Sequence, residues 1–415
     1  MSELSYLEKL MDGVEVEWKT LEDITLRTSN IKWREAIRSY RYIDLTSVDI
    51  ATKKIIETTE ITKNNAPSRA QKLVDENDVI FATTRPTQQR FCLIDSEYAG
   101  AVASTGYCIL RAKKDQVLPK WILHWISTSD FKKHVEENQS GSAYPAISDS
   151  KVKECLIPIP CPDNPEKSLA IQSEIVRILD KFTALTAELT AELTAELNMR
   201  KKQYNYYHDQ LLSFDEEQEK PIYLEKLLDG VEVEWLPLSD LARIRNGKDH
   251  KSLSEGEFPV YGSGGIMRYV DTYAYNKPSV LIPRKGSLGN LFFIDVPFWT
   301  VDTIFYTEID EAQIRPKYLY YFLSTVGLGE MNQAGGVPSQ TQSVLNKLKI
   351  PIPCPDNPEK SLAIQSEIVR ILDKFDTLTN SITEGLPREI ELRQKQYEYY
   401  RDLLFSFPKP ETASN

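Results

Sequence analysis

The sequence predicts an α+β fold: two α/β domains with strand-rich faces, separated by two long antiparallel coiled-coil helices and related by a pseudo-twofold internal repeat. Three observations lead to this prediction. One segment occurs twice, apolar residues after each copy recur at helical spacing, and the stretches in between mix strand-like and helix-like runs. The length of 415 residues also exceeds what a single hydrophobic core usually holds.

The internal repeat is IPIPCPDNPEKSLAIQSEIVRILDKF, which occurs unchanged at 157–182 and 350–375, an offset of 193 residues. The same offset relates RKKQYNYYHDQLLSF, from Arg200, to RQKQYEYYRDLLFSF, from Arg393. Entry segments of the form YLEKLxDGVEVEW begin at Tyr6 and Tyr223. We therefore predict an entry segment and first variable domain at 1–156, a first long helix at 157–214, a linker, entry segment and second variable domain at 215–349, and a second long helix with a tail at 350–415.

The helix prediction rests on the spacing of apolar residues after the proline-rich IPIPCPDNP, which must be extended. Steps of four and three are typical of a coiled-coil seam. The predicted seam residues are Ile171, Ile175, Ile178, Phe182, Leu185 and Leu189, and in the second copy Ile364, Ile368, Ile371, Phe375, Leu378 and Ile382. Two amphipathic helices packed on separate cores remain an alternative, but identical sequence and equal length favour one antiparallel pair.

The first predicted helix contains the unit TAEL three times, at 186–197. Four residues advance a helix by about 6 Å and rotate it by about 40° beyond a full turn, so one unit changes the length of the helix without disrupting it. The predicted spacer residues are Leu185, Leu189, Leu193 and Leu197. The second helix should be interrupted near Gly385 and Pro387.

Composition excludes several classes of protein. The sequence has no apolar run long enough to span a membrane and no secretory leader, so we expect a cytoplasmic protein. Its five cysteines form no C-x-x-C pair and should be reduced, buried thiols. The net charge is −11, yet 19–156 holds 21 basic and 18 acidic residues and 236–349 holds 12 and 11. Such weakly positive domains can bind nucleic acid, with partner subunits adding positive surface.

The variable domains differ in sequence except at their ends, where Pro145 matches Pro338 and Ser150 matches Ser343 at the offset of 193. Loops that combine hydrogen-bond donors with Gly or aromatic residues are candidate DNA contacts. Each residue alone is more simply a solvated loop residue, so only the set carries weight. The candidates are Lys63, Asn64, Asn65, Arg69, Arg85, Gln88, Gln89, Arg90, Ser142 and Tyr144, then Arg245, Asn246, Lys248, Tyr261, Ser263, Arg284, Lys285, Ser287, Ser339 and Gln340, the last two in a loop that also contains Gly335 and Gly336.

Catalytic motifs are missing from the sequence. It contains no G-x-x-x-x-G-K-[ST] loop for ATP, and the N-P-E-K at Asn164 and Asn357 lacks the aromatic residue of a base-methylation motif. Both copies of N-P-E-K look like the start of a helix. The four histidines have no ligand spacing, so we expect neither metal nor acid–base chemistry.

The duplicated IPIP…LAIQSEIVRILDKF, the paired QYxYY ends and the TAEL array together resemble the specificity subunits of type I restriction-modification systems, HsdS, and in particular the EcoR124 type. The resemblance covers essentially the whole chain. It implies two target recognition domains, each binding one half of an asymmetric bipartite DNA sequence, with the helices setting the spacer. It implies no catalytic residues in this chain.

The resemblance also implies partners. Two methyltransferase subunits would dock on the helices and two motor-nuclease subunits would join them, around double-stranded DNA and without a membrane or a homo-oligomer of this chain. S-adenosylmethionine, ATP and Mg²⁺ would be bound by those partners, and this chain would bind no cofactor. A coiled-coil scaffold with two heads for ligands other than DNA is the main alternative, and a self-sufficient restriction enzyme is a third that lacks its motifs.

Overall fold

The structure is a computed structural model, which describes residues 14–214, 227, 231–331, 338–381 and 383–409. Most of both entry segments, Gly335 and Gly336 of the predicted contact loop and the predicted seam residue Ile382 lie outside the described residues. The chain divides into two compact units: unit 1 comprises 1–191 and 391–415, and unit 2 comprises 192–390. The longest helix, α5 (Pro165–Leu212), contributes its first part to unit 1 and its last part to unit 2.

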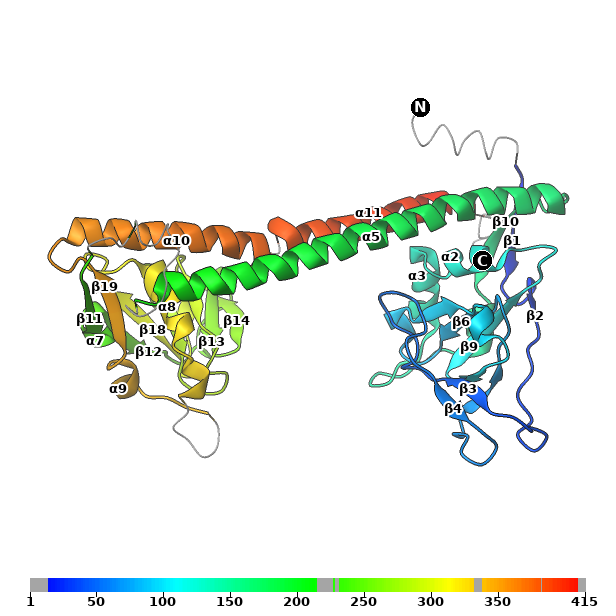
Figure 1. Ribbon diagram of the computed structural model, residues 1–415, viewed down its shortest axis with the longest axis horizontal. Helices are drawn as coiled ribbons and strands as arrows, with labels where there is room; N and C mark the ends of the chain where they lie inside the picture. Colours follow the sequence, from blue (N-terminus) through cyan, green and yellow to red (C-terminus); the bar gives the residue numbers. More distant parts are fainter. Residues whose placement is uncertain (1–13, 215–226, 228–230, 332–337, 382, 410–415) are drawn as a thin grey trace. The chain divides into compact units, whose positions relative to one another are not determined.

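Unit 1 is a mixed α/β domain in which short helices lie between the sheets and α5 (Figure 1). Its strands are β1 (Val16–Thr20), β2 (Thr25–Leu26), β3 (Tyr40–Ile43), β4 (Thr59–Ile61), β5 (Ala70–Leu73), β6 (Val79–Ala82), β7 (Phe91–Leu93), β8 (Val102–Ser104), β9 (Tyr107–Ala112) and β10 (Leu156–Pro160). Its helices are η1 (Pro86–Gln88), η2 (Ser96–Tyr98), α2 (Pro119–Trp125), α3 (Ser129–Asn138) and α4 (Asp149–Lys153), with the end of α11 (Gly385–Leu404).

Unit 2 repeats this composition. Its strands are β11 (Val233–Pro237), β12 (Ala242–Asn246), β13 (Phe258–Gly262), β14 (Gly265–Val270), β15 (Ser279–Pro283), β16 (Phe292–Ile294), β17 (Trp299–Thr300), β18 (Ile304–Ile309) and β19 (Lys349–Pro353). Its helices are α7 (Leu238–Leu241), α8 (Pro316–Thr325), η3 (Leu328–Glu330), α9 (Gln342–Leu345) and α10 (Pro358–Asn380). The expected α+β class with two strand-rich domains is therefore confirmed.

Two of the three sheets in each unit have matching strand orders, and the third has four strands in unit 1 but three in unit 2. Unit 1 contains β1-β10, β2-β9-β6-β7 and β4-β3-β8-β5, and unit 2 contains β11-β19, β12-β18-β15-β16 and β14-β13-β17. Each unit has one parallel pairing among its described strands, β3 with β8 and β13 with β17. The VEVEW segments and the IPIP segments pair with each other, Val16 opposite Pro160 and Val233 opposite Pro353. Two dissimilar sequences thus adopt closely related topologies that differ by one strand in one sheet.

Both N-P-E-K segments begin a helix, as predicted. The Asn164 side chain accepts a hydrogen bond from the Lys167 backbone at 3.0 Å, and Asn357 accepts one from Lys360 at 3.1 Å, which caps α5 and α10. The predicted interruption of the second helix is also present, because α10 ends at Asn380 and α11 starts at Gly385. Gly385 has a φ of +75°, and a Cβ there would lie 2.5 Å from the Thr377 carbonyl oxygen, so only glycine fits.

In each unit a buried glutamine helps to fix the repeated helix to the domain. Gln172 accepts a hydrogen bond from the Leu118 backbone at 2.9 Å and donates to the Gln116 carbonyl at 3.0 Å. Gln365 accepts from Arg315 at 2.8 Å and donates to the Gln313 carbonyl at 3.1 Å. Because both side chains are fully buried, these bonds replace water and fix the register of the helix against the domain.

Each unit also contains parts of both conserved helical segments. In unit 1, Phe182 stacks on Tyr400 at 5.7 Å between ring centroids, and the Thr183 hydroxyl is 2.9 Å from that of Tyr397. In unit 2, Tyr207 stacks on Phe375 at 5.4 Å. One prediction fails in this region, since Leu185 of the expected seam is 52% exposed, whereas Ile171 and Ile175 are buried in the domain core. Packing against the domain, not a continuous helix seam, buries those two residues.

The core of unit 1 is completed by the segment after α11. Phe405 lies 4.6 Å from Trp121 and 5.5 Å from Trp125, measured between ring centroids. The Trp18 indole donates a hydrogen bond to the Pro408 carbonyl at 2.7 Å. Unit 1 is therefore discontinuous in sequence, and its hydrophobic core includes residues from both ends of the described chain.

All five cysteines are free thiols, three of them buried (Cys92, Cys108 and Cys155) and two partly exposed (Cys161 and Cys354). Burial raises the pKa of Cys92 to about 12, so this thiol stays protonated and unreactive near neutral pH. In the part of the chain that the structure describes, no three His, Cys, Asp or Glu side chains are grouped as metal ligands. No described helix is long and apolar enough to cross a membrane.

Candidate nucleic-acid interface

The first contact surface, residues 83–90 and 139–147, brings together two loops that are distant in sequence. The Arg85 backbone N–H donates to the Pro145 carbonyl at 2.7 Å, and the Ile147 N–H donates to the Thr83 carbonyl at 2.9 Å. Arg85 itself has a left-handed backbone with a φ of 50°. Several backbone hydrogen bonds fix this conformation. The exposed side chains are therefore attached to a preorganised backbone, which lowers the entropy cost of binding a ligand.

The exposed face of the first contact surface carries donors beside an aromatic ring. The Arg85 guanidinium lies 5.3 Å from the centre of the Tyr144 ring, and Tyr144 is 71% exposed. Ser142 and Gln88 are exposed on the same two loops. Arginine and glutamine can donate to base edges or phosphates, so these exposed side chains are available for the predicted nucleic-acid contact.

Two other predicted contacts in this loop have internal partners. The Arg90 guanidinium donates to the carbonyls of Leu45 and Val48, the latter at 2.6 Å. The Lys53 ammonium donates to the Gln89 carbonyl and lies 4.4 Å from the centre of the Phe91 ring. Desolvation lowers the pKa of Lys53 to about 8. Arg90 therefore stabilises the loop through internal hydrogen bonds. Gln89 is half-buried, and its carbonyl accepts the hydrogen bond from Lys53.

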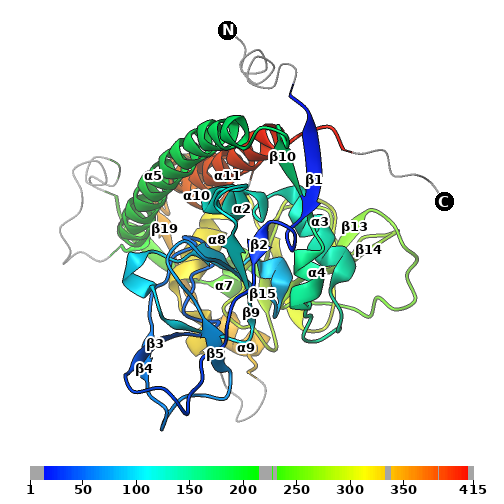
Figure 2. The ribbon, with the colours of Figure 1, turned by 90° about the vertical axis from the view of Figure 1, so that its right-hand side faces the viewer.

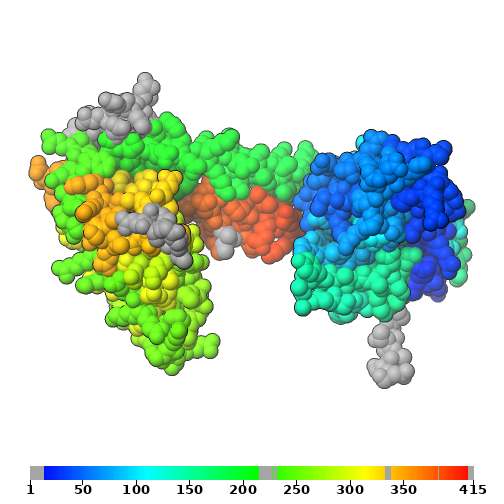
Figure 3. Space-filling model, turned by 90° about the horizontal axis from the view of Figure 1, so that it is seen from below, coloured from blue at the N-terminus to red at the C-terminus, as the bar shows by residue number. Residues whose placement is uncertain are grey.

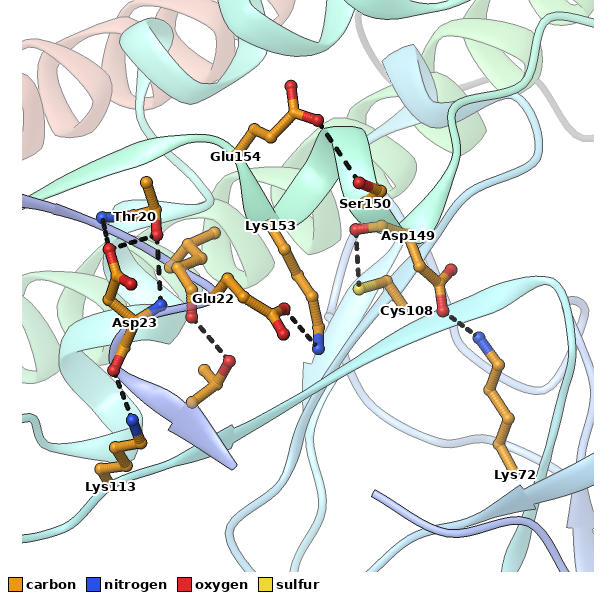
Figure 4. Close-up of polar contacts among 12 residues, drawn as sticks. Thr20, Glu22, Asp23, Lys72, Cys108, Lys113, Asp149, Ser150, Lys153 and Glu154 are labelled. Atoms are coloured by element: carbon orange, nitrogen blue, oxygen red, sulfur yellow. Dashed lines mark hydrogen bonds and ion pairs between the residues drawn. The ribbon is translucent and has the colours of Figure 1, made fainter. Parts of the chain in front are cut away.

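Helix α4 anchors the second of these loops to the domain (Figure 4). The Ser148 side chain caps α4 by accepting a hydrogen bond from the Lys151 backbone at 3.2 Å. Asp149 then pairs with Lys72 of β5, and Lys153 pairs with Glu22 at 2.9 Å. Contacts at both ends of α4 thus hold the loop 139–147 from its C-terminal side.

The remaining predicted contacts of unit 1 lie on the β4–β5 connection. Lys63, Asn64, Asn65 and Arg69 are all exposed. The Asn65 side chain accepts a hydrogen bond from the Thr62 backbone at 2.6 Å, so it shapes its own turn. The Arg69 carbonyl accepts from the Thr105 N–H at 2.8 Å, and the neighbouring Gly106 carbonyl accepts from Thr83 at 2.8 Å. This chain of backbone bonds places Arg69 next to the first contact surface.

The second contact surface, residues 284–291 and 338–341, repeats the backbone pattern of the first. The Gly286 N–H donates to the Pro338 carbonyl at 2.9 Å, and the Gln340 N–H donates to the Arg284 carbonyl at 3.0 Å. Lys285 forms an isolated β-bridge with Ser339, as Thr84 does with Ala146. Residues 83, 84 and 85 thus correspond to residues 284, 285 and 286, with Pro145 equivalent to Pro338.

The exposed groups of the second surface come from Lys285 and Ser287, with Arg284 half-buried beside them. Lys285 pairs with Asp302 at 3.6 Å, and the Arg284 guanidinium lies 5.8 Å from the centre of the Phe305 ring. Ser263, from the β13–β14 turn, accepts a hydrogen bond at its carbonyl from the Asn290 side chain at 3.2 Å. Three loops therefore meet at this surface.

Two residues predicted as contacts in unit 2 are buried. Tyr261 is 9% exposed and packs in a cluster with Leu281 and Phe298. Gln340 is 2% exposed, and its amide donates to the Pro283 carbonyl at 2.6 Å. In this structure neither side chain is available to DNA, so both are assigned to supporting the loops. Their residue types resembled contacts, but exposure could not be judged from type alone.

The other predicted residues of unit 2 lie at the end of β12. Arg245 pairs with Glu308 at 2.9 Å, and the Asn246 side chain accepts from Gln342 of α9 at 3.3 Å. Lys248 is exposed, and the adjacent Gly247 is required because a Cβ there would lie 1.9 Å from the Val301 carbonyl oxygen. Sequence reasoning missed Lys53 and Asn290, which hold these loops through backbone groups. The matched prolines at offset 193 were the available signal for the shared loop.

Comparison with known proteins identifies the family. The model of the type I restriction modification DNA specificity domain matches residues 14–199 and again 230–392. The chain belongs to the type I restriction-modification specificity subunits. The EcoR124I/EcoR124II specificity subunit of Escherichia coli is 41% identical over the full length of both chains. The EcoprrI specificity subunit of the same species is 35% identical and covers 92% of this chain and 93% of that one.

Solved structures agree with this specificity-subunit assignment at the level of fold. A chain solved in work on assembly and conformational transition of a type I R-M system matches with a TM-score of 0.69 and 20% identity, covering 94% of this chain and 97% of that chain. The HsdS subunit from Thermoanaerobacter tengcongensis matches with a TM-score of 0.54 and 20% identity, over 94% and 96% of the two chains. As a specificity subunit, this chain has a role in DNA specificity and is not the catalytic component.

Proposed function

We propose that this specificity subunit binds two different short sequences in duplex DNA, one at each contact surface, so that the complete target is bipartite and asymmetric. One observation carries the proposal: equivalent backbone hydrogen bonds hold residues 83–85 in unit 1 and 284–286 in unit 2, and the exposed cation is Arg85 in the first loop but Lys285 in the second. A common loop frame with different donors suits two readers of different base sequences. Arg85 and Arg284 are the residues we expect to contribute most to specificity.

The long helices set the distance between the two half-sites in this proposal. Reciprocal stacking supports an antiparallel, pseudo-twofold coiled-coil arrangement, because Phe182 with Tyr400 and Phe375 with Tyr207 are the same pair of positions exchanged by 193 residues. The helices of segments 157–214 and 350–415 then act as spacers between recognition domains 1–156 and 215–349. The TAEL units in α5 make this spacing adjustable in steps of four residues, each slightly more than one helical turn.

Other subunits supply the chemistry. We propose that two methyltransferase subunits dock on the helices, that two motor-nuclease subunits join them, and that S-adenosylmethionine, ATP and Mg²⁺ bind to those partners. The acidic net charge of −11 supports a need for partners, since the chain alone offers little positive surface to DNA. In the working complex this chain is present without a second copy of itself.

The test is to assemble the chain with methyltransferase subunits and select bound duplexes from a pool with a randomised window. We expect two unlike half-sites at a fixed spacing, and affinity that falls with added salt. A palindromic target would contradict independent recognition by the two units. A chain that assembles yet binds no duplex under any salt condition would favour the alternative, a scaffold whose heads bind other ligands.

Deleting one TAEL unit, 194–197, tests the spacer role. The deletion shortens the helix by about 6 Å and rotates it by about 40°, comparable to one or two base-pair steps. We expect methylation sequencing to recover the same half-sites with a spacer shorter by one or two base pairs. Changed half-site bases with an unchanged spacer would refute this role for the helices.

A further inference from the structure

The β13–β14 hairpin of unit 2 exposes an unusual concentration of apolar side chains. The two strands lie side by side and are joined by the turn residues Ser263 and Gly264 (Figure 2). Ile266 is 50% exposed, Met267 is 59% exposed and Tyr269 is 49% exposed. Clustered apolar residues of this size on a surface usually mark a site of interaction.

At the tip of this hairpin, Gly264 and Gly265 directly precede the apolar residues Ile266 and Met267. Side chains added at Gly264 or Gly265 would meet nothing within 4 Å, and Gly265 has a φ of +111°. The strand pairing shifts register after Val260, because Val260 pairs with Arg268 but Tyr261 pairs with Ile266. Met267 is therefore the unpaired residue of a β-bulge in β14. A Cβ at Gly262 would lie 2.8 Å from the Met267 sulfur, so Gly262 makes room for Met267.

The hairpin tip is continuous with the second contact surface. Besides the bond to Asn290, the Ser263 backbone N–H donates to the Thr303 hydroxyl at 3.3 Å, and a Cβ at Gly286 would lie 3.3 Å from the Ser263 hydroxyl oxygen. Residues 258–270 include Arg268 and no carboxylate. Yellow-green residues of this part of the chain form a projecting end of unit 2 (Figure 3). A hairpin tip without carboxylates can approach a polyanion without like-charge repulsion.

We propose, building on the DNA-binding function above, that Ile266 and Met267 form an apolar wedge that inserts between base pairs at the second half-site. Bulky aliphatic side chains next to a glycine backbone can approach the duplex closely and unstack one step, which kinks the DNA. Neither side chain can hydrogen-bond a base edge. The wedge therefore discriminates between DNA sequences by how easily they kink. It favours a pyrimidine–purine step, which unstacks readily, in or beside the second half-site.

Fluorescence of 2-aminopurine, placed in turn at each position of the second half-site, tests the wedge in the full chain assembled with methyltransferase subunits. The variant Ile266→Ser/Met267→Ser should bind its target about ten-fold or more weakly and lose the fluorescence increase that reports unstacking. The dependence of affinity on salt should keep its slope, because no phosphate contact is removed. Substituting a rigid step for the pyrimidine–purine step should weaken the unaltered chain and leave the serine variant unchanged.

Two control variants make the result decisive. Ile266→Leu/Met267→Leu keeps bulk and apolarity, so it should retain both affinity and the fluorescence signal. Ile37→Ser removes a side chain that is 99% exposed in unit 1, and it should change neither. A serine variant with unaltered fluorescence and affinity overturns the wedge, and so does a leucine variant that loses both.

Other outcomes assign the surface differently. Loss of methyltransferase association by the serine variant, with DNA binding intact, would make the hairpin a protein-docking surface and overturn the wedge. If the unaltered assembly bound no specific duplex, the proposed function itself would fail, which the first measurement reveals before any variant is made.

Discussion

The two contact surfaces have the same backbone and different side chains. In unit 1 the residue whose backbone N–H donates to the Pro145 carbonyl is Arg85. In unit 2 the equivalent residue, which donates to the Pro338 carbonyl, is Gly286. The neighbouring Thr83 and Thr84 are replaced by Arg284 and Lys285. Backbone geometry is thus a property of the scaffold, while the side chains on it are free to differ. A protein built this way can change its target without changing its fold.

The helix-to-domain contacts show the opposite behaviour, since there both backbone and side chain are kept. Gln172 and Gln365 make equivalent hydrogen bonds in the two units. Lys120 pairs with Asp180 at 2.6 Å, and Lys317 pairs with Asp373 at 2.8 Å. The contrast separates residues that fix the helices to the domains from the loop residues that we propose recognise DNA, and each unit can be tested by itself.

The largest effect should come from removing the buried glutamines. Gln172→Leu and Gln365→Leu each leave two backbone groups without their partner, at a cost of about 2–4 kcal/mol. Hydrogen exchange followed by mass spectrometry should show lost protection in α2 for the first variant and in α8 for the second, by similar amounts. Unequal losses would mean that the two units do not share this anchor equally.

A smaller, site-specific effect is expected for the two arginines. Arg85→Ala should reduce selectivity at the first half-site by roughly 10- to 100-fold and leave the second unchanged, since one good arginine contact contributes about 1–3 kcal/mol of discrimination. Arg284→Ala should do the reverse. Binding assays on duplexes altered in one half-site at a time measure both. Arg69→Ala, outside the shared loop frame, serves as a comparison, and a uniform loss across both half-sites would argue for phosphate contacts instead.

Lys53 lies in unit 1 and contacts the Gln89 carbonyl there, so its titration should affect the stability of unit 1. Its pKa is lowered from about 10.5 to about 8 by desolvation, and the unfolded chain therefore binds more protons between these two values. Stability of the unaltered protein relative to Lys53→Met should rise as the pH increases from about 8 to about 10.5, and stay constant below that window. Urea midpoints of both proteins across this range provide the measurement. A difference that is independent of pH would show that Lys53 titrates normally.

The smallest effect concerns the predicted seam. Leu185 is 52% exposed, whereas Leu378, its equivalent in the repeat, is half-buried. Leu185→Ala should therefore change stability by less than about 0.5 kcal/mol, the usual range for a surface substitution. Leu378→Ala should cost more. If the order were reversed in thermal unfolding of the assembled complex, Leu185 would be buried there by a partner or by the second helix.

Much of the architecture could be predicted because repetition is visible without a structure. The offset of 193 residues located both helices, both caps at Asn164 and Asn357, and the strand-forming IPIP segments. Gly385 marked the break between α10 and α11 for a local reason, its positive φ. The seam prediction at Leu185 was wrong because the spacing of apolar residues does not show whether a particular one is covered by a neighbouring element or left exposed.

The contact surfaces were predictable only in part. Loop composition pointed to Arg85 and Arg284, which the structure places at equivalent loops. It could not separate exposed donors from buried ones, so Gln340 and Tyr261 were included although both are nearly inaccessible. It also could not find Lys53, whose contact with the Gln89 carbonyl spans 36 residues and follows no local pattern.

The discontinuity of unit 1 has a consequence for how the polypeptide is made. Phe405 and Phe407 cover Trp121 and Trp125, yet the ribosome synthesises them only after every residue of unit 2. Until then the nascent first domain lacks the phenylalanine rings that pack against these two indoles. Unit 2 is contiguous in sequence, so it can complete its core earlier. Unit 1, although its synthesis begins first, is therefore the last to complete its core.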